Sequence, residues 1–101
     1  MKTYKLKAYE NISARFEEVR GPQIFQAVGE FCVRVETPSV MAALEVLYAI
    51  GNIGVHDAQG KLWPTNRRSL SVGDLAVVGA SKYACARAGW RRTSAKHTLN
   101  G

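Results

Sequence analysis

Residues 37–51 read TPSVMAALEVLYAIG, and this stretch carries the clearest structural signal in the chain. Thr37 can cap a helix, Pro38 has the backbone angle favoured at the first helical position, and Gly51 can end the helix. Apolar residues recur between these ends at helical spacing: Val40, Met41, Leu44, Leu47, Tyr48 and Ile50. The pattern predicts one amphipathic helix that packs on a sheet.

Segments on both sides of this helix alternate between apolar and polar residues, as strands do. Residues 3–9 and residues 31–36 precede it, and the lysines of the first segment suit a sheet edge. Residues 75–78 and 83–87 follow it and are joined by four residues with turn chemistry. We expect these last two strands to form a hairpin that Gly89-Trp90 closes.

Two further segments are less regular. Residues 13–20 are compatible with two helical turns that Ser13 caps and Gly21-Pro22 ends. Residues 52–65 read as a loop with a short hairpin around 58–60. The sequence therefore predicts an α+β fold in which one main helix packs on a small, largely antiparallel sheet that ends in a C-terminal hairpin.

The chain has 101 residues, of which 47% are hydrophobic, and this is enough for one modest core. We expect a single domain over residues 1–92 and a flexible polar tail over residues 93–101. The longest apolar stretch, residues 40–50, is about half the length that crosses a bilayer. No apolar segment of a secretion signal follows the first lysines, so we expect the chain to stay in the compartment that made it.

Charge is divided unevenly between the two halves of the chain. Residues 1–60 hold six Lys/Arg against seven Asp/Glu, whereas residues 61–101 hold eight Lys/Arg and one carboxylate side chain, Asp74. Such asymmetry points to an acidic partner, which could be nucleic acid, a membrane surface or an acidic protein. The candidate partner-binding residues are Lys61, Trp63, Arg67, Arg68, Arg87, Arg91 and Arg92.

A second interpretation of the same residues needs no partner. Trp63 and Trp90 are then core residues, and the cations keep a small domain of net charge +6 soluble. In the first interpretation the arginines grip phosphate or carboxylate groups, and a tryptophan ring stacks on a base or a guanidinium group.

Catalytic and metal-binding patterns have little support. His56-Asp57 could suggest acid–base chemistry, but adjacent loop residues do not normally face each other. His97 lies in the expected tail, and the glycines form no phosphate-binding motif. Cys32 and Cys85 match no metal-ligand spacing, so they are buried free thiols or, if their strands pair, a disulfide. We expect no enzyme, no cofactor and no metal.

One stretch resembles a known pattern. Residues 68–78 read RSLSVGDLAVV, and YACA at 83–86 and Gly89-Trp90 follow. This arrangement resembles small phage, plasmid and actinobacterial accessory proteins of unassigned function, over about residues 31–92. In the motif, Ser71 and Asp74 can bond their own backbone, Gly73 can take a positive φ, and Trp90 can pack over the hairpin. The turn itself does not require Arg67 or Arg68.

The resemblance implies a phage or mobile-element protein that acts in the cytoplasm of a bacterial host. The leading hypothesis is a non-enzymatic module that binds and modulates a host protein or protein complex with an acidic surface. The alternative is a nucleic-acid-binding protein that uses the basic half. A homodimer is also possible, because Ile24-Phe25 could form an exposed apolar patch.

Overall fold

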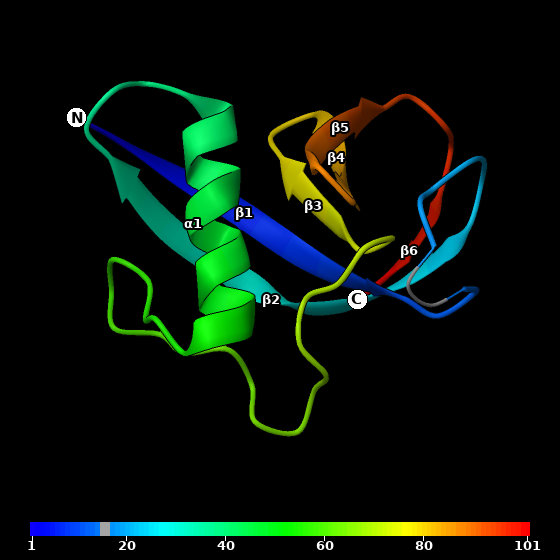
Figure 1. The fold of residues 1–101 in the computed structure, drawn as a ribbon, viewed down its shortest axis with the longest axis horizontal. Coiled ribbons are helices and arrows are strands. Elements are labelled where there is room, and N and C mark those ends of the chain that lie inside the picture. The colour runs from blue at the N-terminus through cyan, green and yellow to red at the C-terminus, as the bar shows by residue number, and fades with distance from the viewer. Residues whose placement is uncertain (15–16) are drawn as a thin grey trace.

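One helix packs on a curled, six-stranded sheet in residues 1–14 and 17–101, which are the residues that this computed structural model describes (Figure 1). The strand order is β5-β4-β3-β1-β2-β6, and every pair is antiparallel except β2 with β6. The α+β fold predicted from the sequence is confirmed. The elements are β1 (Lys2–Asn11), β2 (Ile24–Val35), α1 (Val40–Ile53), β3 (Leu75–Val78), β4 (Ser81–Ala86), β5 (Gly89–Thr93) and β6 (Thr98–Asn100).

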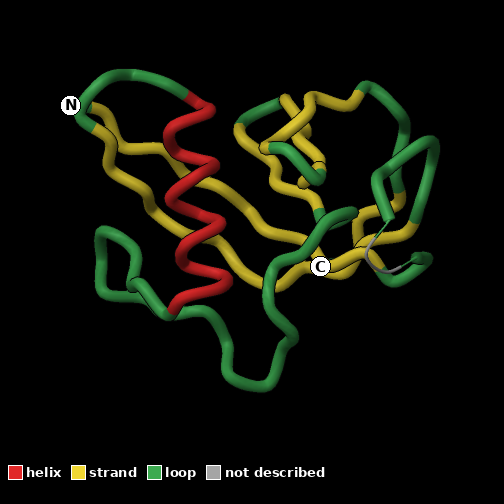
Figure 2. The backbone as a smooth tube through the Cα atoms, in the orientation of Figure 1, coloured by secondary structure: helices red, strands yellow, loops and turns green. Residues whose placement is uncertain are grey.

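The long ribbon of β1 and β2 runs through the molecule and contains one bulge (Figure 2). Ala8 pairs with Gly29 and Tyr9 pairs with Ala27, so Val28 is an extra residue on β2. An extra residue reverses which face of the sheet the following side chains occupy. As a result β2 buries Phe31 on the helix side and Phe25 on the opposite side.

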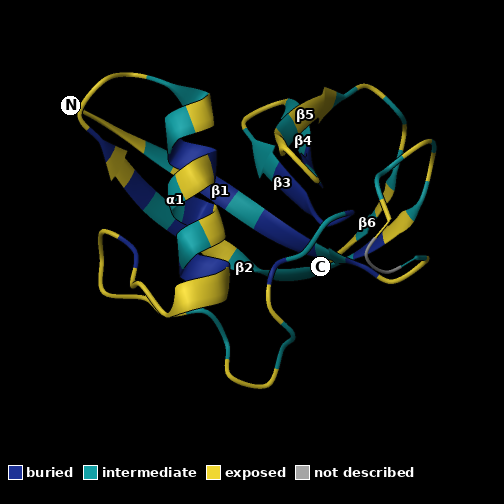
Figure 3. Cartoon of the chain, viewed as in Figure 1, coloured by how far each residue is buried: buried dark blue, intermediate teal, exposed yellow. Residues whose placement is uncertain are grey.

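The main core lies between α1 and the sheet. Its residues are buried, and those that α1 contributes are the dark bands that recur along the helix in Figure 3. The ring of Trp63 stacks on Phe31 with centroids 5.5 Å apart, so the loop after α1 also covers this core. The core residues are Leu6, Ala8, Phe31, Val33, Val35, Ala43, Leu44, Leu47, Ile50, Leu70, Ala76 and Cys85.

A second, smaller cluster lies on the other face of the sheet. It consists of Tyr9, Phe25, Leu75 and Ala84, with Val19 and Leu99 packed against it. Phe25 is fully buried and Ile24 is 44% exposed. The expectation that Ile24-Phe25 forms an exposed apolar patch is therefore wrong for Phe25, because the bulge turns that ring into the cluster.

The helix begins and ends later than the sequence predicts. Ser39, not Thr37, is the N-cap, since its hydroxyl accepts a hydrogen bond from the N–H of Ala42 at 3.1 Å. The helix also continues through Gly51 to Ile53, and Gly54, whose φ is 78°, is its C-cap. Met41 and Tyr48, which were assigned to the apolar stripe, are 48% and 41% exposed.

The short helix predicted for residues 13–20 is absent from its described residues, 13, 14 and 17–20. The side-chain oxygen of Asn11 accepts hydrogen bonds from the N–H groups of Ser13 and Ala14, both at 2.9 Å. This bonding turns the chain out of β1 before a helical turn can form. Residues 15 and 16 of the predicted helix lie outside the described residues.

The C-terminal region is longer than a hairpin. Gly89 begins β5 rather than closing the hairpin, because Arg87 and Ala88 form the turn. Residues 93–101, which we expected to be a flexible tail, contribute the end of β5 and all of β6. His97 fixes this segment: Nδ1 accepts from the N–H of Gln23 at 3.2 Å, and the ring meets Phe25 edge-on. Burial, together with Lys82, lowers the pKa of His97 and favours this neutral, accepting form.

Cys32 and Cys85 are free thiols. They lie on β2 and β4, which β1 and β3 separate, so the alternative in which their strands pair is wrong. Burial raises the pKa of the Cys85 thiol to about 11. No helix among the described residues is long and apolar enough to cross a membrane.

Replacing Gly51 with alanine should destabilise the protein, although alanine is the better helix former. A Cβ at this position would lie 2.6 Å from Cβ of Leu70, which belongs to the core. We expect a loss of about 1–3 kcal/mol in the free energy of unfolding, measured by urea denaturation. Gly21→Ala is the control, because nothing lies within 4 Å of its added Cβ. Equal stability of the two variants would contradict the packing described for Gly51.

Candidate binding surface

The structure divides the seven candidate residues into three separate groups. Arg67 and Arg68 are partly buried and paired with carboxylates, Lys61 and Trp63 lie beside β2, and Arg87, Arg91 and Arg92 lie on the β4–β5 hairpin. The candidates therefore do not form one continuous site.

Arg67 and Arg68 hold the end of β1 against the segment before β3. Arg67 donates to Glu10 Oε1 through Nη2 at 2.9 Å and to the backbone oxygen of Ala27 at 3.1 Å. Arg68 donates to Glu10 Oε2 through Nε at 3.1 Å and to both carboxylate oxygens of Asp74, at 2.7 and 2.9 Å. Two arginines thus neutralise two carboxylates, and the cluster adds nothing to the net charge.

Asp74 is the centre of this cluster and is 3% exposed. Besides Arg68, it accepts hydrogen bonds from the N–H groups of Asn11 and Ser71, both at 2.9 Å. Burial raises the pKa of the Asp74 carboxyl, whereas Arg68 and the two N–H donors oppose that rise. The same pairing raises the pKa of Arg68 against the effect of its own burial.

The two ends of the stretch 68–74 are therefore bonded to each other, and the stretch forms one structural motif. Arg68 at its start binds Asp74 at its end, and Asp74 donates its N–H to the backbone oxygen of Ser71 at 3.0 Å. Gly73 has a φ of 94°, and a Cβ there would collide with the backbone oxygen of Glu17. The predicted roles of Ser71, Gly73 and Asp74 are confirmed, but Arg68 is part of the motif rather than additional to it.

Lys61 and Trp63 belong to the loop that covers β2. Lys61 donates from Nζ to the backbone oxygen of Glu30 at 2.9 Å, and Nζ lies 4.9 Å from the centre of the Phe31 ring. Trp63 donates from Nε1 to the backbone oxygen of Arg68 at 3.0 Å. Trp63 is a packed residue, as the interpretation without a partner predicts.

Asp57 closes the same edge of the sheet. It is 4% exposed, and its carboxylate accepts hydrogen bonds from the N–H groups of Cys32, Gln59 and Lys61 at 2.8 to 2.9 Å. Burial alone would raise the pKa of Asp57, but these donors and the charge of Lys61 hold it below its ordinary value of 3.8. The His56 ring contacts the backbone oxygen of Asp57, not its carboxylate, so the two side chains form no acid–base pair.

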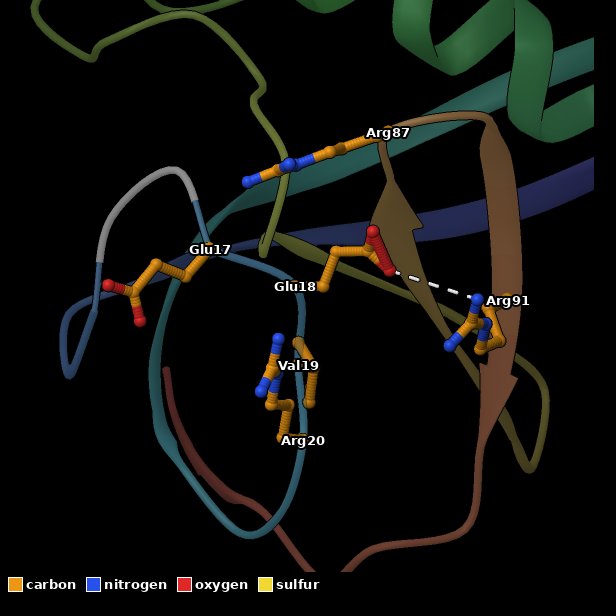
Figure 4. Close-up of a pocket in the computed structure, with 6 residues that line it drawn as sticks. All are labelled: Glu17, Glu18, Val19, Arg20, Arg87 and Arg91. Atoms are coloured by element: carbon orange, nitrogen blue, oxygen red, sulfur yellow. Dashed lines mark ion pairs between the residues drawn. The ribbon is translucent and has the colours of Figure 1, made fainter.

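Lys61, Arg87, Arg91 and Arg92 are the exposed candidates, and the three arginines are the ones that lie on the hairpin. Arg87 and Arg91 line a hollow of about 700 Å³ together with residues 17–20 (Figure 4). Arg91 lies 3.8 Å from Glu18 and its side chain is 72% exposed, so this ion pair is weak. In Figure 4 the Glu17 carboxylate points away from the arginines.

Arg20 joins this group, although sequence reasoning missed it. It lines the hollow with Arg87 and Arg91, and a second hollow with Arg91 and Arg92. Nothing in the sequence around Arg20 indicates that it lies near the other arginines, because only the fold brings residues 17–21 beside β5. We call Arg20, Arg87, Arg91 and Arg92 the hairpin arginines.

The described residues hold no group of three or more His, Cys, Asp or Glu side chains that could bind a metal ion. Comparison with protein families, curated proteins and solved structures found no match to this chain.

Removing Arg68 should destabilise the fold strongly. Arg68→Ala leaves the buried Asp74 carboxylate without its cation, and breaking such a pair costs about 3–5 kcal/mol. Because the Arg68 side chain is 18% exposed, we expect a somewhat smaller loss in the free energy of unfolding, about 2–4 kcal/mol. Thermal or urea unfolding measures it. The control Arg92→Ala should change stability by less than about 0.5 kcal/mol, and a loss in the control as large as that of Arg68→Ala would contradict the division of roles.

Asp57→Asn should destabilise the protein in a pH-dependent way. The asparagine side chain has one acceptor oxygen where the carboxylate has two, so it cannot accept from all three N–H groups. We expect the free energy of unfolding to fall by about 1–3 kcal/mol at neutral pH. Because folding lowers the pKa of Asp57, its stabilisation is present above the ordinary value of 3.8 and is lost as pH falls through the lower folded value. The difference in free energy of unfolding between the wild type and Asp57→Asn, measured by urea denaturation, should therefore become smaller in acid. A constant gap would contradict the assignment.

Proposed function

We propose that this chain is a non-enzymatic accessory protein of phage or mobile-element type, which binds an acidic surface of a bacterial host protein through the hairpin arginines and modulates that protein. The observation that supports the proposal is the excess of positive charge that the ion pairs of the fold do not neutralise. Arg67 and Arg68 are neutralised by Glu10 and Asp74, but no carboxylate side chain follows Asp74 in the sequence. Five cations do: Lys82, Arg87, Arg91, Arg92 and Lys96.

Four of these cations lie on the β4–β5 hairpin, at one end of the sheet, and Lys96 lies in the connection from β5 to β6. Guanidinium groups there can meet carboxylates in paired hydrogen bonds and so give an interface both affinity and orientation. The bacterial host is inferred from the resemblance of about residues 31–92 to small phage, plasmid and actinobacterial accessory proteins.

Nucleic acid would supply negative charge as well, but a protein partner fits the described residues better. A single-strand binder stacks bases on exposed aromatic rings. Here Trp63 stacks on Phe31, and Trp90 packs against the main core. The two tryptophans therefore serve the fold, and the cations alone do not favour phosphate over carboxylate.

Reversing two hairpin charges should abolish capture of the partner. The tagged wild-type protein is expected to retain one stoichiometric protein from a nuclease-treated bacterial lysate, and Arg91→Glu with Arg92→Glu should retain at least about tenfold less. The control is Lys5→Glu with Arg34→Glu, which makes the same charge change on exposed residues of the β1–β2 ribbon beyond β3.

Equal losses in the two double variants would contradict the assignment to the hairpin. Tight binding of duplex DNA at about 0.1 M salt, weakened by Arg91→Glu with Arg92→Glu, would favour the nucleic-acid alternative instead.

A further inference from the structure

β5 is a free edge of the sheet. It pairs with β4 on one side, and no described segment pairs with it on the other. The opposite end of the sheet is treated differently: β6 pairs with the start of β2, and the loop with Asp57 and Lys61 bonds to the backbone of Cys32 and Glu30. β6 and this loop thus cover the outer side of β2, and the two edge strands of the described sheet are β6, with three residues, and β5, with five.

The pairing of β4 and β5 fixes which backbone groups of β5 point outward. Cys85 donates its N–H to the backbone oxygen of Asp74 at 2.8 Å and accepts from the N–H of Gly73 at 2.9 Å, both on the side away from β5. Trp90 lies opposite Cys85, so this pair is not hydrogen-bonded and the N–H and C=O of Trp90 point away from β4. Two residues on, the backbone groups of Arg92 point the same way.

A pocket opens beside this edge on the helix side. It has a volume of about 220 Å³, and one carboxylate, that of Glu45, lies in its wall, which favours an apolar side chain over an acidic one in the pocket itself. The other lining residues are Tyr48, Val72, Cys85, Ala86, Arg87, Gly89 and Trp90. Trp90 and Arg92 project to this face of β5, whereas Arg91 projects to the other face, toward Glu18. A strand that paired with β5 would therefore place alternate side chains near the pocket and near Arg91.

We propose that β5 accepts an extended acidic segment of the partner as an added strand, with an apolar side chain opposite Trp90 and carboxylates opposite Arg91 and Arg92. This inference rests on the proposed function and specifies how the partner binds. Hydrogen bonds to the backbone of Trp90 and Arg92 supply affinity, and the pocket and the arginines select the sequence. A second copy of β5 is disfavoured as the added strand, because arginines would face arginines across the new pair.

The probe is a capped peptide, Thr-Val-Glu-Glu-Leu-Thr-Thr, which places Leu opposite Trp90 when it pairs antiparallel. Amide hydrogen exchange, followed by NMR, is the readout. On saturation the amides of Trp90 and Arg92 should exchange at least about tenfold more slowly, whereas those of Arg91 and Thr93, already bonded to β4, should change little. This alternation is specific to strand addition.

Two controls remove the backbone hydrogen bonds and keep the charge. The same peptide N-methylated at Leu and at the first Glu should bind at least about tenfold more weakly. In the protein, Arg92→Pro removes the outward N–H without removing a bond to β4, as proline is tolerated on an edge strand. It should bind the peptide at least about fivefold more weakly than Arg92→Ala, which lacks only the charged side chain.

Equal binding of the methylated and unmethylated peptides would overturn strand addition, as would uniform protection along β5 or no binding of the peptide. If the lysate partner is still lost with Arg91→Glu and Arg92→Glu in any of these cases, the proposed function stands and only the mode of binding fails. If that partner is retained, the proposed function fails by its own test.

Discussion

The contact between Arg68 and Asp74 is the constraint on which most of this structure depends. Asp74 is buried, and its carboxylate also holds the end of β1 and the turn before β3. Because Arg68 reaches Glu10 as well, one guanidinium group ties the β1–β2 ribbon to the strands that follow the long loop. A buried carboxylate without this cation would be costly, so the motif 68–74 and the end of β1 must fold together.

The fold then leaves one group of charges unused. Both carboxylates of the network are matched, and Asp57 is satisfied by backbone N–H groups. Lys61 lies beside β2, whereas Lys82, Arg87, Arg91 and Arg92 lie on the β4–β5 hairpin. Residues 17–21 add Arg20 there because Val19 packs into the second hydrophobic cluster. Arginine thus serves two purposes: Arg68 holds the motif 68–74 together, and the exposed arginines are the ones that we propose bind a partner.

Periodicity and turn chemistry predicted the fold class, the helix and β3, and they predicted the turn made by Ser71, Gly73 and Asp74. They failed where a tertiary contact decides the outcome. Gly51 does not end the helix; it is the residue against which Leu70 packs, and the helix continues past this contact. Phe25 is buried because the Val28 bulge reverses the face of β2. Local patterns could not separate Arg67 and Arg68 from the hairpin arginines either, since the ion pairs with Glu10 span 57 and 58 residues of sequence.

The central claim is that the arginines divide into a structural pair and an exposed set. NMR of the arginine side-chain Nε–H groups, during titration with polyglutamate at about 0.1 M salt, tests this claim directly. The account predicts that the Nε–H signals of Arg67 and Arg68 exchange slowly with water and stay in place, while those of Arg87, Arg91 and Arg92 exchange fast and shift. Shifts at Arg67 and Arg68 with none at the hairpin would contradict it.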